Sequence, residues 1–295
     1  MPSLPLSPRA GHLPFPSAHE VFTVSGHTAP MNVSRIPSSE PSSSITFARV
    51  GVIGDVHAEH DRLEKVLEWL SGQNVDAIIC TGDLADGRGC IDRTCALLDS
   101  AGAIAVAGNH DRWLLQDRVR HLPDAHRLDA INDRTVDYLR GLPTSVTLET
   151  TAGSLMLCHG VGENDLAKIW PGTERSPIER SARLDEIIAT ERFRFLVNGH
   201  LHYRVMIDFE NLLVLNAGTL KGGYAGVSVM DFSADGVSSF AVTDEGPPVL
   251  VAEHTLSPTS SRRIWRDTQC FDGAWEPLAL YARPLGQSTA RQAAS

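Results

Sequence analysis

The stretch ARVGVIGDVH, residues 48–57, places a short apolar run directly before a glycine, an aspartate and a histidine. The same arrangement returns in VDAIICTGDLAD, residues 75–86, and in AIAVAGNHD, residues 103–111. A short apolar run bounded by Gly and polar residues is typical of a buried β-strand. The three stretches therefore predict three strands, each of which ends at side chains that can carry chemistry.

Helical patterns follow these strands. Residues 60–70 place Leu63, Val66, Leu67 and Leu70 on one helical face, and residues 91–100 form a second helical stretch. A third helix is expected directly after the third strand. Strands that alternate with helices at this spacing predict a parallel sheet with crossover connections.

The pattern changes after residue 143, where shorter strands follow one another and several are separated only by turns. We expect a helix near residues 180–191, and strands at residues 145–150, 154–158, 193–197, 205–209, 212–215, 226–231 and 237–242. Strands joined by tight turns pair antiparallel. The sequence therefore predicts a layered α/β domain of mixed strand direction over residues 46–245.

Both ends of the chain differ from this domain. Residues 1–45 are rich in Pro and Ser and carry four charged residues, so they predict a disordered tail. Met31 lies inside this tail and is an alternative start of the chain. We expect residues 246–295, which begin Gly-Pro-Pro, to form a C-terminal extension that is partly disordered. One interpretation is a small β extension over the site, and the other is a strand or two packed on the core.

Composition excludes several classes of protein. The chain of 295 residues has 26 Lys+Arg against 36 Asp+Glu, and its net charge of −10 disfavours nucleic acid as a partner. It contains no apolar stretch long enough to cross a bilayer, so we expect no membrane partner. Five cysteines without a close CxxC pair do not form a disulfide framework, and they favour a cytoplasmic location.

Five short motifs lie at or near the ends of predicted strands: Gly54-Asp55-Val56-His57, Gly82-Asp83-Leu84-Ala85-Asp86, Gly108-Asn109-His110-Asp111, Cys158-His159-Gly160 and Gly199-His200-Leu201-His202. Their Asp, His and Asn side chains offer oxygen and nitrogen ligands of the kind that suit Mn, Fe or Zn. On an extended segment, Asp55 and His57 would point the same way because side-chain direction has a period of two, and so would His200 and His202.

Each motif alone also has a purely structural interpretation. An Asp-x-His segment is often a surface turn, and a lone histidine after an apolar strand, such as His159, is often a hydrogen-bonded core residue. All five motifs in order, each preceded by an apolar strand, favour a site that holds two cations about 3.5–4 Å apart.

The five motifs resemble the complete signature of the calcineurin-like metallophosphoesterases, over about residues 47–220. The resemblance implies a four-layer α/β/β/α sandwich with two mixed sheets and a dinuclear metal site. It implies two divalent metal ions, with Mn²⁺ favoured and Fe, Zn, Ni or Co as alternatives. The implied residues are Asp55, His57 and His202 for the first metal, Asn109, His159 and His200 for the second, Asp83 bridging both, and His110 as the catalytic histidine oriented by Asp86.

The resemblance also implies hydrolysis of phosphodiester bonds by attack of a metal-bridging hydroxide. Gly-Asn-His-Asp and Gly-His-x-His are closest to the small prokaryotic phosphodiesterases. Protein phosphatases and dinucleoside tetraphosphatases have Gly-Asp-x-x-Asp-Arg-Gly, whereas Asp86 is followed here by Gly87, Arg88 and Gly89. A phosphomonoesterase, protein phosphatase or dinucleoside polyphosphate hydrolase is therefore the alternative, and a non-catalytic binding scaffold of the same fold is a remoter one.

Substrate contacts are less well defined by the sequence. We expect a small phosphorylated substrate, with Arg88 and Arg112 as candidate contacts, although Arg112 also fits the start of a helix. Residues 160–180 form a polar loop after His159, in which the candidates are Asn164, Lys168, Trp170 and Arg175. The oligomeric state stays open, and a homo-oligomer is one alternative.

Overall fold

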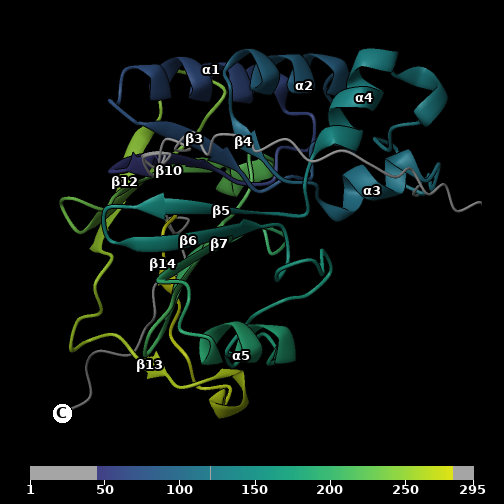
Figure 1. Ribbon diagram of the computed structural model, residues 1–295. Helices are drawn as coiled ribbons and strands as arrows, with labels where there is room; N and C mark the ends of the chain where they lie inside the picture. Colours follow the sequence, from purple (N-terminus) through teal and green to yellow (C-terminus); the bar gives the residue numbers. More distant parts are fainter. Residues whose placement is uncertain (1–44, 120, 282–295) are drawn as a thin grey trace, which may run out of the picture. The chain divides into compact units, whose positions relative to one another are not determined.

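The computed structural model describes residues 45–119 and 121–281 (Figure 1). The predicted tail at residues 1–44 and the last part of the C-terminal extension lie outside the described residues. Two β-sheets form the centre of the described part, and five α-helices accompany them. None of these helices is both long enough and apolar enough to cross a membrane.

The first sheet contains the three strands predicted from the opening motifs. β2 (Arg49–Ile53), β3 (Ala77–Cys80) and β4 (Ile104–Ala105) are parallel neighbours, as predicted. Antiparallel strands complete the sheet in the order β12-β11-β10-β2-β3-β4, and they are β10 (Gly226–Asp231), β11 (Gly236–Ala241) and β12 (Val249–Thr255).

The second sheet has the order β1-β5-β6-β7-β9-β8-β13, and β14 also pairs with β8. It mixes parallel and antiparallel pairs, since β5 and β6 form a hairpin whereas β6, β7 and β9 run parallel. Its strands are β1 (Thr46–Phe47), β5 (Ser145–Thr150), β6 (Gly153–Cys158), β7 (Phe195–Asn198), β8 (Arg204–Phe209), β9 (Leu213–Ala217), β13 (Ile264–Trp265) and β14 (Leu278–Ala279).

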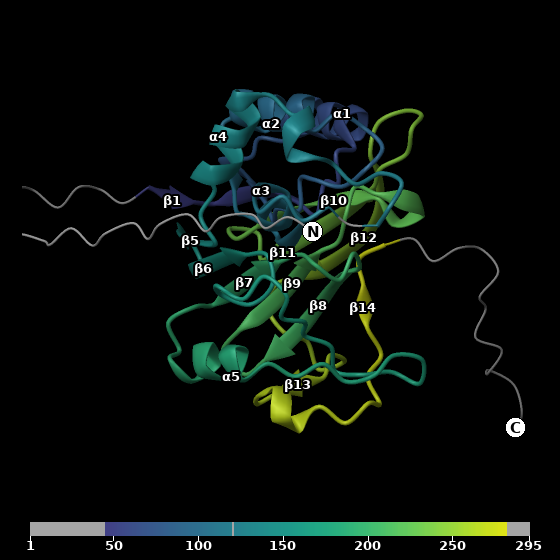
Figure 2. The same ribbon diagram turned by 90° about the vertical axis from the view of Figure 1, so that its right-hand side faces the viewer.

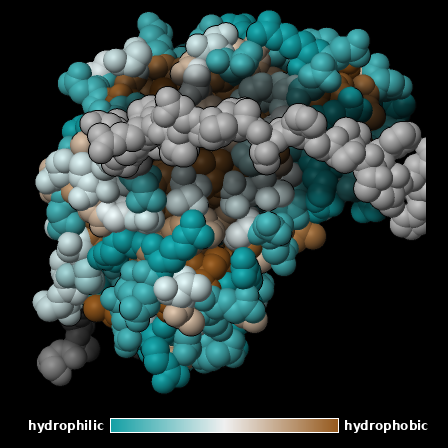
Figure 3. Space-filling view, in the orientation of Figure 1, coloured by the Kyte–Doolittle hydropathy of each residue, from teal (hydrophilic) through white to brown (hydrophobic). Residues whose placement is uncertain are grey.

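Helices cover the outer faces of both sheets, so the predicted four-layer α/β/β/α sandwich is confirmed (Figure 1). On the first sheet lie α1 (His60–Ser71), α2 (Ile91–Ser100) and α4 (Asp133–Gly141). On the second lies α5 (Ala182–Ala189), beside the aromatic side chains of the C-terminal segment. The exposed faces of these helices are largely hydrophilic (Figure 3).

Successive side chains of β2 point to opposite faces of the sheet, and this alternation explains how the layers pack together. Val50 and Val52 pack between the two sheets, whereas Ile53 packs under the helices. Gly51 faces Leu70 of α1, and a Cβ atom at position 51 would lie 2.8 Å from a Leu70 methyl group. A glycine here therefore allows α1 to lie close against the sheet.

The fold also contains elements outside the strands and helices that the apolar patterns predict up to residue 245. Helix α4 is not predicted, although Asn132 caps it by accepting a hydrogen bond from the Thr135 amide at 2.8 Å. β12 joins the first sheet and β13 and β14 join the second, so residues 249–279 contribute strands to both sheets. Three short 3₁₀ helices, at Leu128–Ala130, Gly222–Tyr224 and Thr268–Cys270, lie in the connections.

Candidate metal centre

Both sheets bring predicted ligands to one place. Asp55 and His57 follow β2, Asp83 follows β3, and α3 (Asn109–Leu115) begins at Asn109. From the second sheet, His159 follows β6, and His200 and His202 follow β7. Helix α3 lies on the right of Figure 1 and so faces the viewer in Figure 2. The ends of strands from two facing sheets therefore meet beside α3.

One group of possible ligand atoms comes from Asp55, His57, Asp83 and His202, all within 4.8 Å of one another. The Nε2 atoms of His57 and His202 are 3.0 Å apart, and Nε2 of His202 lies 3.3 Å from Oδ2 of Asp55. Nε2 of His57 lies 4.0 Å from Oδ2 of Asp83. This is the spacing expected of atoms that surround one small cation.

A second group comes from Asp83, His159 and His200, again with ligand atoms within 4.8 Å. Nε2 of His159 lies 3.3 Å from Oδ2 of Asp83 and 3.0 Å from Oδ1 of Asn109. Asp83 thus belongs to both groups. The structure brings all seven predicted ligands together.

Hydrogen bonds fix which ring nitrogens face this centre. Nδ1 of His57 lies 3.0 Å from the carbonyl oxygen of Ala85, and Nδ1 of His159 lies 2.8 Å from that of Thr81. Carbonyl oxygens only accept, so Nδ1 carries a hydrogen, and Nε2 is the nitrogen that would present a lone pair to a bound metal ion. This second interaction, from the far nitrogen to a carbonyl, is typical of metal-ligating histidines.

The Asn109 amide adds a further test of fit. Its Oδ1 atom faces Nε2 of His159 and Nδ1 of His200, and turning the amide over would place its NH₂ group 3.0 and 2.9 Å from the same nitrogens. An amide oxygen and two imidazole nitrogens that converge in this way can all serve as ligands of one cation between them. The donor set therefore fits divalent metal ions of the Mn, Fe or Zn type.

The buried carboxylates and histidines of the centre shift one another's pKa values. Burial opposes ionisation of Asp83, but the neighbouring His159 outweighs it and holds the pKa of Asp83 well below its ordinary value. Burial alone would lower the pKa of His159, but the carboxylates of Asp83 and Asp55 together raise it to about 10. Burial lowers the pKa of His200 to about 4. Without metal, a proton on His159 balances the buried carboxylates.

The backbone conformation at three of the predicted histidine ligands differs from the prediction. The expectation that the Asp-x-His and His-x-His pairs lie on extended segments is wrong, because φ is 48° at His57, 70° at His200 and 61° at His202. Left-handed turns, which cost free energy in non-glycine residues, direct these side chains inward. Gly199 makes room for the turn, since a Cβ atom there would lie 2.0 Å from Oδ1 of Asp55.

His110 lies beside the two groups. Its Nδ1 is 2.7 Å from Oδ2 of Asp86, and its Nε2 is 3.9 Å from Oδ2 of Asp83. Burial raises the pKa of Asp86, but hydrogen bonds from His110 and the His126 amide outweigh burial and hold it below its ordinary value. An ionised Asp86 therefore accepts from Nδ1 and leaves Nε2 directed at the centre.

Residues 49–235 match the family described as the calcineurin-like phosphoesterase superfamily domain. The chain belongs to this superfamily. It is a metallophosphoesterase with buried His and Asp groups that can hold metal. No curated protein matches the chain.

The solved structures that are similar to this metallophosphoesterase share little of its sequence. A hypothetical protein, PH1004 from Pyrococcus horikoshii OT3, is 12% identical with a TM-score of 0.55, over 67% of this chain and 88% of that one. A metallophosphoesterase from Sphaerobacter thermophilus is 21% identical with a TM-score of 0.49, over 67% and 88%. The phosphoesterase Yfce from E. coli is 18% identical with a TM-score of 0.44, over 71% and 100%.

One residue of the metallophosphoesterase site was missed by the sequence. The His126 amide donates to Oδ1 of Asp86 at 2.9 Å, and Nδ1 of His126 accepts from the Asp86 amide at 2.9 Å. This reciprocal pair holds Asp86 in the position that meets His110. His126 lies in an irregular loop 40 residues after Asp86, where no motif or periodicity marks it.

Asp111 holds two of the motifs together. Its Oδ1 accepts from the amides of Leu84 and Ala85 at 2.8 and 3.0 Å, and its Oδ2 accepts from that of Gly108 at 2.9 Å. Burial raises its pKa, and the like charge of Asp83 raises it further. The last residue of Gly-Asn-His-Asp thus fixes the loop that carries Asp83 against the start of α3.

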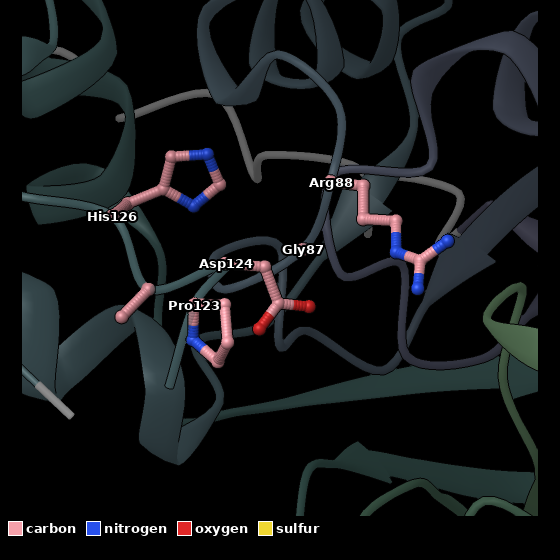
Figure 4. Close-up of a pocket in the computed structure, with 6 residues that line it drawn as sticks. Gly87, Arg88, Pro123, Asp124 and His126 are labelled. Atoms are coloured by element: carbon pink, nitrogen blue, oxygen red, sulfur yellow. The ribbon is translucent and has the colours of Figure 1, made fainter. Parts of the chain in front are cut away.

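The predicted substrate contacts have different surroundings. Arg112 is bound by both carboxylate oxygens of Asp165, at 2.6 and 3.0 Å. Arg88 is exposed and lines a pocket of about 570 Å³ with Asp124 and His126, among others (Figure 4). Oδ2 of Asp124 accepts from Lys221 at 2.9 Å. The pocket therefore borders the loop that holds Asp86.

The loop after His159 approaches the centre at Asp165, which the sequence did not single out, and at Lys168, which it did. The carbonyl oxygen of Asp165 approaches the Asn109 amide, and the charge of Lys168 contributes to the lowered pKa of His200. Trp170 lies further along, with its ring centroid 6.3 Å from that of Tyr203. Asn164 and Arg175 are exposed, and Arg175 lies in the turn closed by Thr173 and Ser176.

Proposed function

We propose that this protein hydrolyses phosphodiester bonds with two divalent metal ions. The observation that carries the proposal is the position of Asp83, which belongs to both groups of ligand atoms, with Nε2 of His110 3.9 Å away. A shared carboxylate places two cations close enough to act on one phosphate group. In this proposal Asp55, His57 and His202 hold the first ion, Asn109, His159 and His200 hold the second, and Asp83 contacts both.

The metal ions, when bound, neutralise the phosphate charge and supply a water of lowered pKa as the nucleophile. We favour Mn²⁺, because the ligands are carboxylate oxygens, an amide oxygen and imidazole nitrogens without a thiolate.

The five cysteines are free in the structure, which supports a cytoplasmic location.

His110 acts on the leaving group in this proposal. Asp86 accepts from Nδ1 and thereby holds the ring in place, so that a proton carried on Nε2 can be donated to an oxygen of the substrate. As the P–O bond to the leaving group breaks, that oxygen gains charge, and Nε2–H stabilises or protonates it. A positioned acid of this kind typically contributes about 10²–10⁴ in rate.

Charge near the centre supports a diester over a monoester substrate. Asp165 neutralises Arg112, and Asp124 neutralises Lys221. A monoester is dianionic near neutral pH and gains more than a monoanionic diester from additional cations. Arg88 is the feature that favours the alternative, a phosphomonoesterase, because its exposed guanidinium could contact a terminal phosphate.

Hydrolysis of bis(p-nitrophenyl) phosphate and of p-nitrophenyl phosphate, measured side by side with Mn²⁺, tests the proposal. His110→Ala and Asp83→Asn serve as controls, with bound metal measured for each protein. We expect metal-dependent release from the diester that both substitutions abolish. Release from the monoester alone would assign a phosphatase, and two bound metals without any release would favour a binding scaffold.

A further inference from the structure

The metal centre is open to solvent on one side. Among its proposed ligands, Asp55, His57, Asp83, Asn109 and His159 are at most 2% exposed. The His202 side chain, in contrast, is 42% exposed. His202 therefore lies on the open side of the centre.

Three tyrosines gather beside this opening. Tyr203 directly follows His202 and is 44% exposed, and Tyr224 is 38% exposed. The ring centroids of Tyr203 and Tyr224 are 6.0 Å apart, those of Tyr203 and Tyr281 are 6.0 Å apart, and those of Tyr224 and Tyr281 are 5.2 Å apart. We call Tyr203, Tyr224 and Tyr281 the tyrosine cluster. Its members come from three separate segments of the chain.

A buried arginine holds these segments together. Arg204 is 1% exposed, and burial lowers its pKa to about 10. Its Nη1 donates to the carbonyl oxygen of Tyr224 at 2.9 Å, and its Nε donates to that of Leu280 at 2.9 Å. Arg204 follows Tyr203, and Leu280 precedes Tyr281. One buried cation thus links the three segments that carry the tyrosines, so that the cluster is held in place before any ligand arrives.

Partly exposed aromatic rings that are fixed in this way mark a binding surface. Trp170 supports the cluster from the side, since its ring lies 6.3 Å from Tyr203 and 5.1 Å from the buried Trp275. Tyr203 directly follows the proposed ligand His202, and Leu220, four residues before Tyr224, donates its amide to the carbonyl oxygen of Asp55 at 2.9 Å. Two of the three segments that carry the tyrosine cluster are therefore joined to proposed metal ligands. Aromatic rings stack on nucleobases of any sequence, because every base has a π-face.

We propose that the tyrosine cluster binds the base of a nucleotide whose phosphate lies at the metal centre. The substrate class is then a nucleotide phosphodiester. This inference rests on the proposed function for the position of the phosphate. The base is recognised by its planar face, so the subsite accepts several bases and rejects phosphate esters that lack one.

Binding of AMP and of ribose 5-phosphate tests the subsite, because the two ligands share a phosphate and differ in the base. Calorimetry is performed on the full chain with Mn²⁺, in a His110→Ala background that prevents turnover. We expect AMP to bind about tenfold more tightly than ribose 5-phosphate. Tyr203→Ala should bring the ratio of the two Kd values close to one, whereas Tyr203→Phe, which keeps the ring, should preserve it.

Leu250→Ala is the matched control, because Leu250 is an exposed apolar residue of β12 outside the cluster, and it should leave the ratio unchanged. Tyr224→Ala provides a second test if Tyr203→Ala lowers the melting temperature. Equal Kd values in the parent protein, or a ratio preserved in both alanine variants, would overturn the subsite. If the protein hydrolyses phosphodiesters but binds AMP and ribose 5-phosphate with equal Kd values, the subsite is rejected and the proposed function stands. If it binds AMP more tightly but hydrolyses no phosphodiester, the proposed function is rejected and the subsite stands.

Discussion

At the scale of single residues, His110 depends on side chains that position it through hydrogen bonds. The family resemblance implies that Asp86 orients His110, and the structure places Oδ2 of Asp86 2.7 Å from Nδ1 of His110. The sequence could not predict His126, because a reciprocal side-chain and backbone pair between distant loops leaves no periodic pattern. Its effect on the proposed reaction is nevertheless open to a direct test.

His126→Ala should lower kcat about tenfold with little change in KM, because Asp86 loses the acceptor for its amide and His110 loses its fixed position. His126→Asn should restore most of kcat, since an asparagine oxygen can accept at the position of Nδ1. The measurement is kcat and KM for bis(p-nitrophenyl) phosphate in the three proteins. Equal kcat in the alanine variant, or no recovery with asparagine, would show that the pair does not position Asp86.

Metal binding should depend on pH through His159. Burial lowers its pKa, but Asp83 and Asp55 raise it to about 10 in the metal-free protein, so His159 is protonated at neutral pH. A histidine ligates metal in its neutral form, and binding therefore releases this proton. Affinity for Mn²⁺ should rise with pH, by up to about tenfold per unit below pH 10. Calorimetry in buffers of different ionisation enthalpy measures the release, and an affinity that is constant from pH 7 to 9 would contradict it.

At the scale of elements, the sequence predicts strands and helices better than the turns after them. The apolar run of β2 and the helical face of α1 are evident in the sequence, because packing against one neighbour imposes a period. The left-handed turns at His57, His200 and His202 are not, because non-glycine residues seldom adopt them. Tertiary contacts around the metal centre, rather than local preference, hold these turns.

Gly199 shows how tightly one of these turns is packed. Gly199→Ala would place a methyl group 2.0 Å from Oδ1 of Asp55 and push that carboxylate out of position. We expect the affinity for Mn²⁺ to fall by about 10–100-fold, as when a group that orients a ligand is lost. Gly141→Ala is the matched control, because a Cβ atom there meets nothing within 4 Å. Unchanged Mn²⁺ affinity in Gly199→Ala would show that the turn can move.

At the scale of the whole described chain, the centre joins two facing sheets. Asp55, His57, Asp83 and Asn109 follow strands of the first sheet, and the other three predicted ligands follow strands of the second. The order of the five motifs predicts this convergence only through the family resemblance. Spacing alone does not reveal which strands face each other, because the crossing between sheets is fixed by packing of the apolar layer between them.

The shared position of Asp83 is the central claim, and it requires that two metal ions act together. The most direct measurement titrates metal-free protein with Mn²⁺ while hydrolysis of bis(p-nitrophenyl) phosphate is followed. We predict that activity reaches its maximum only at two equivalents of Mn²⁺ per chain, and that Asp83→Asn abolishes it. Full activity at one equivalent, or no hydrolysis with two bound ions, would contradict the account.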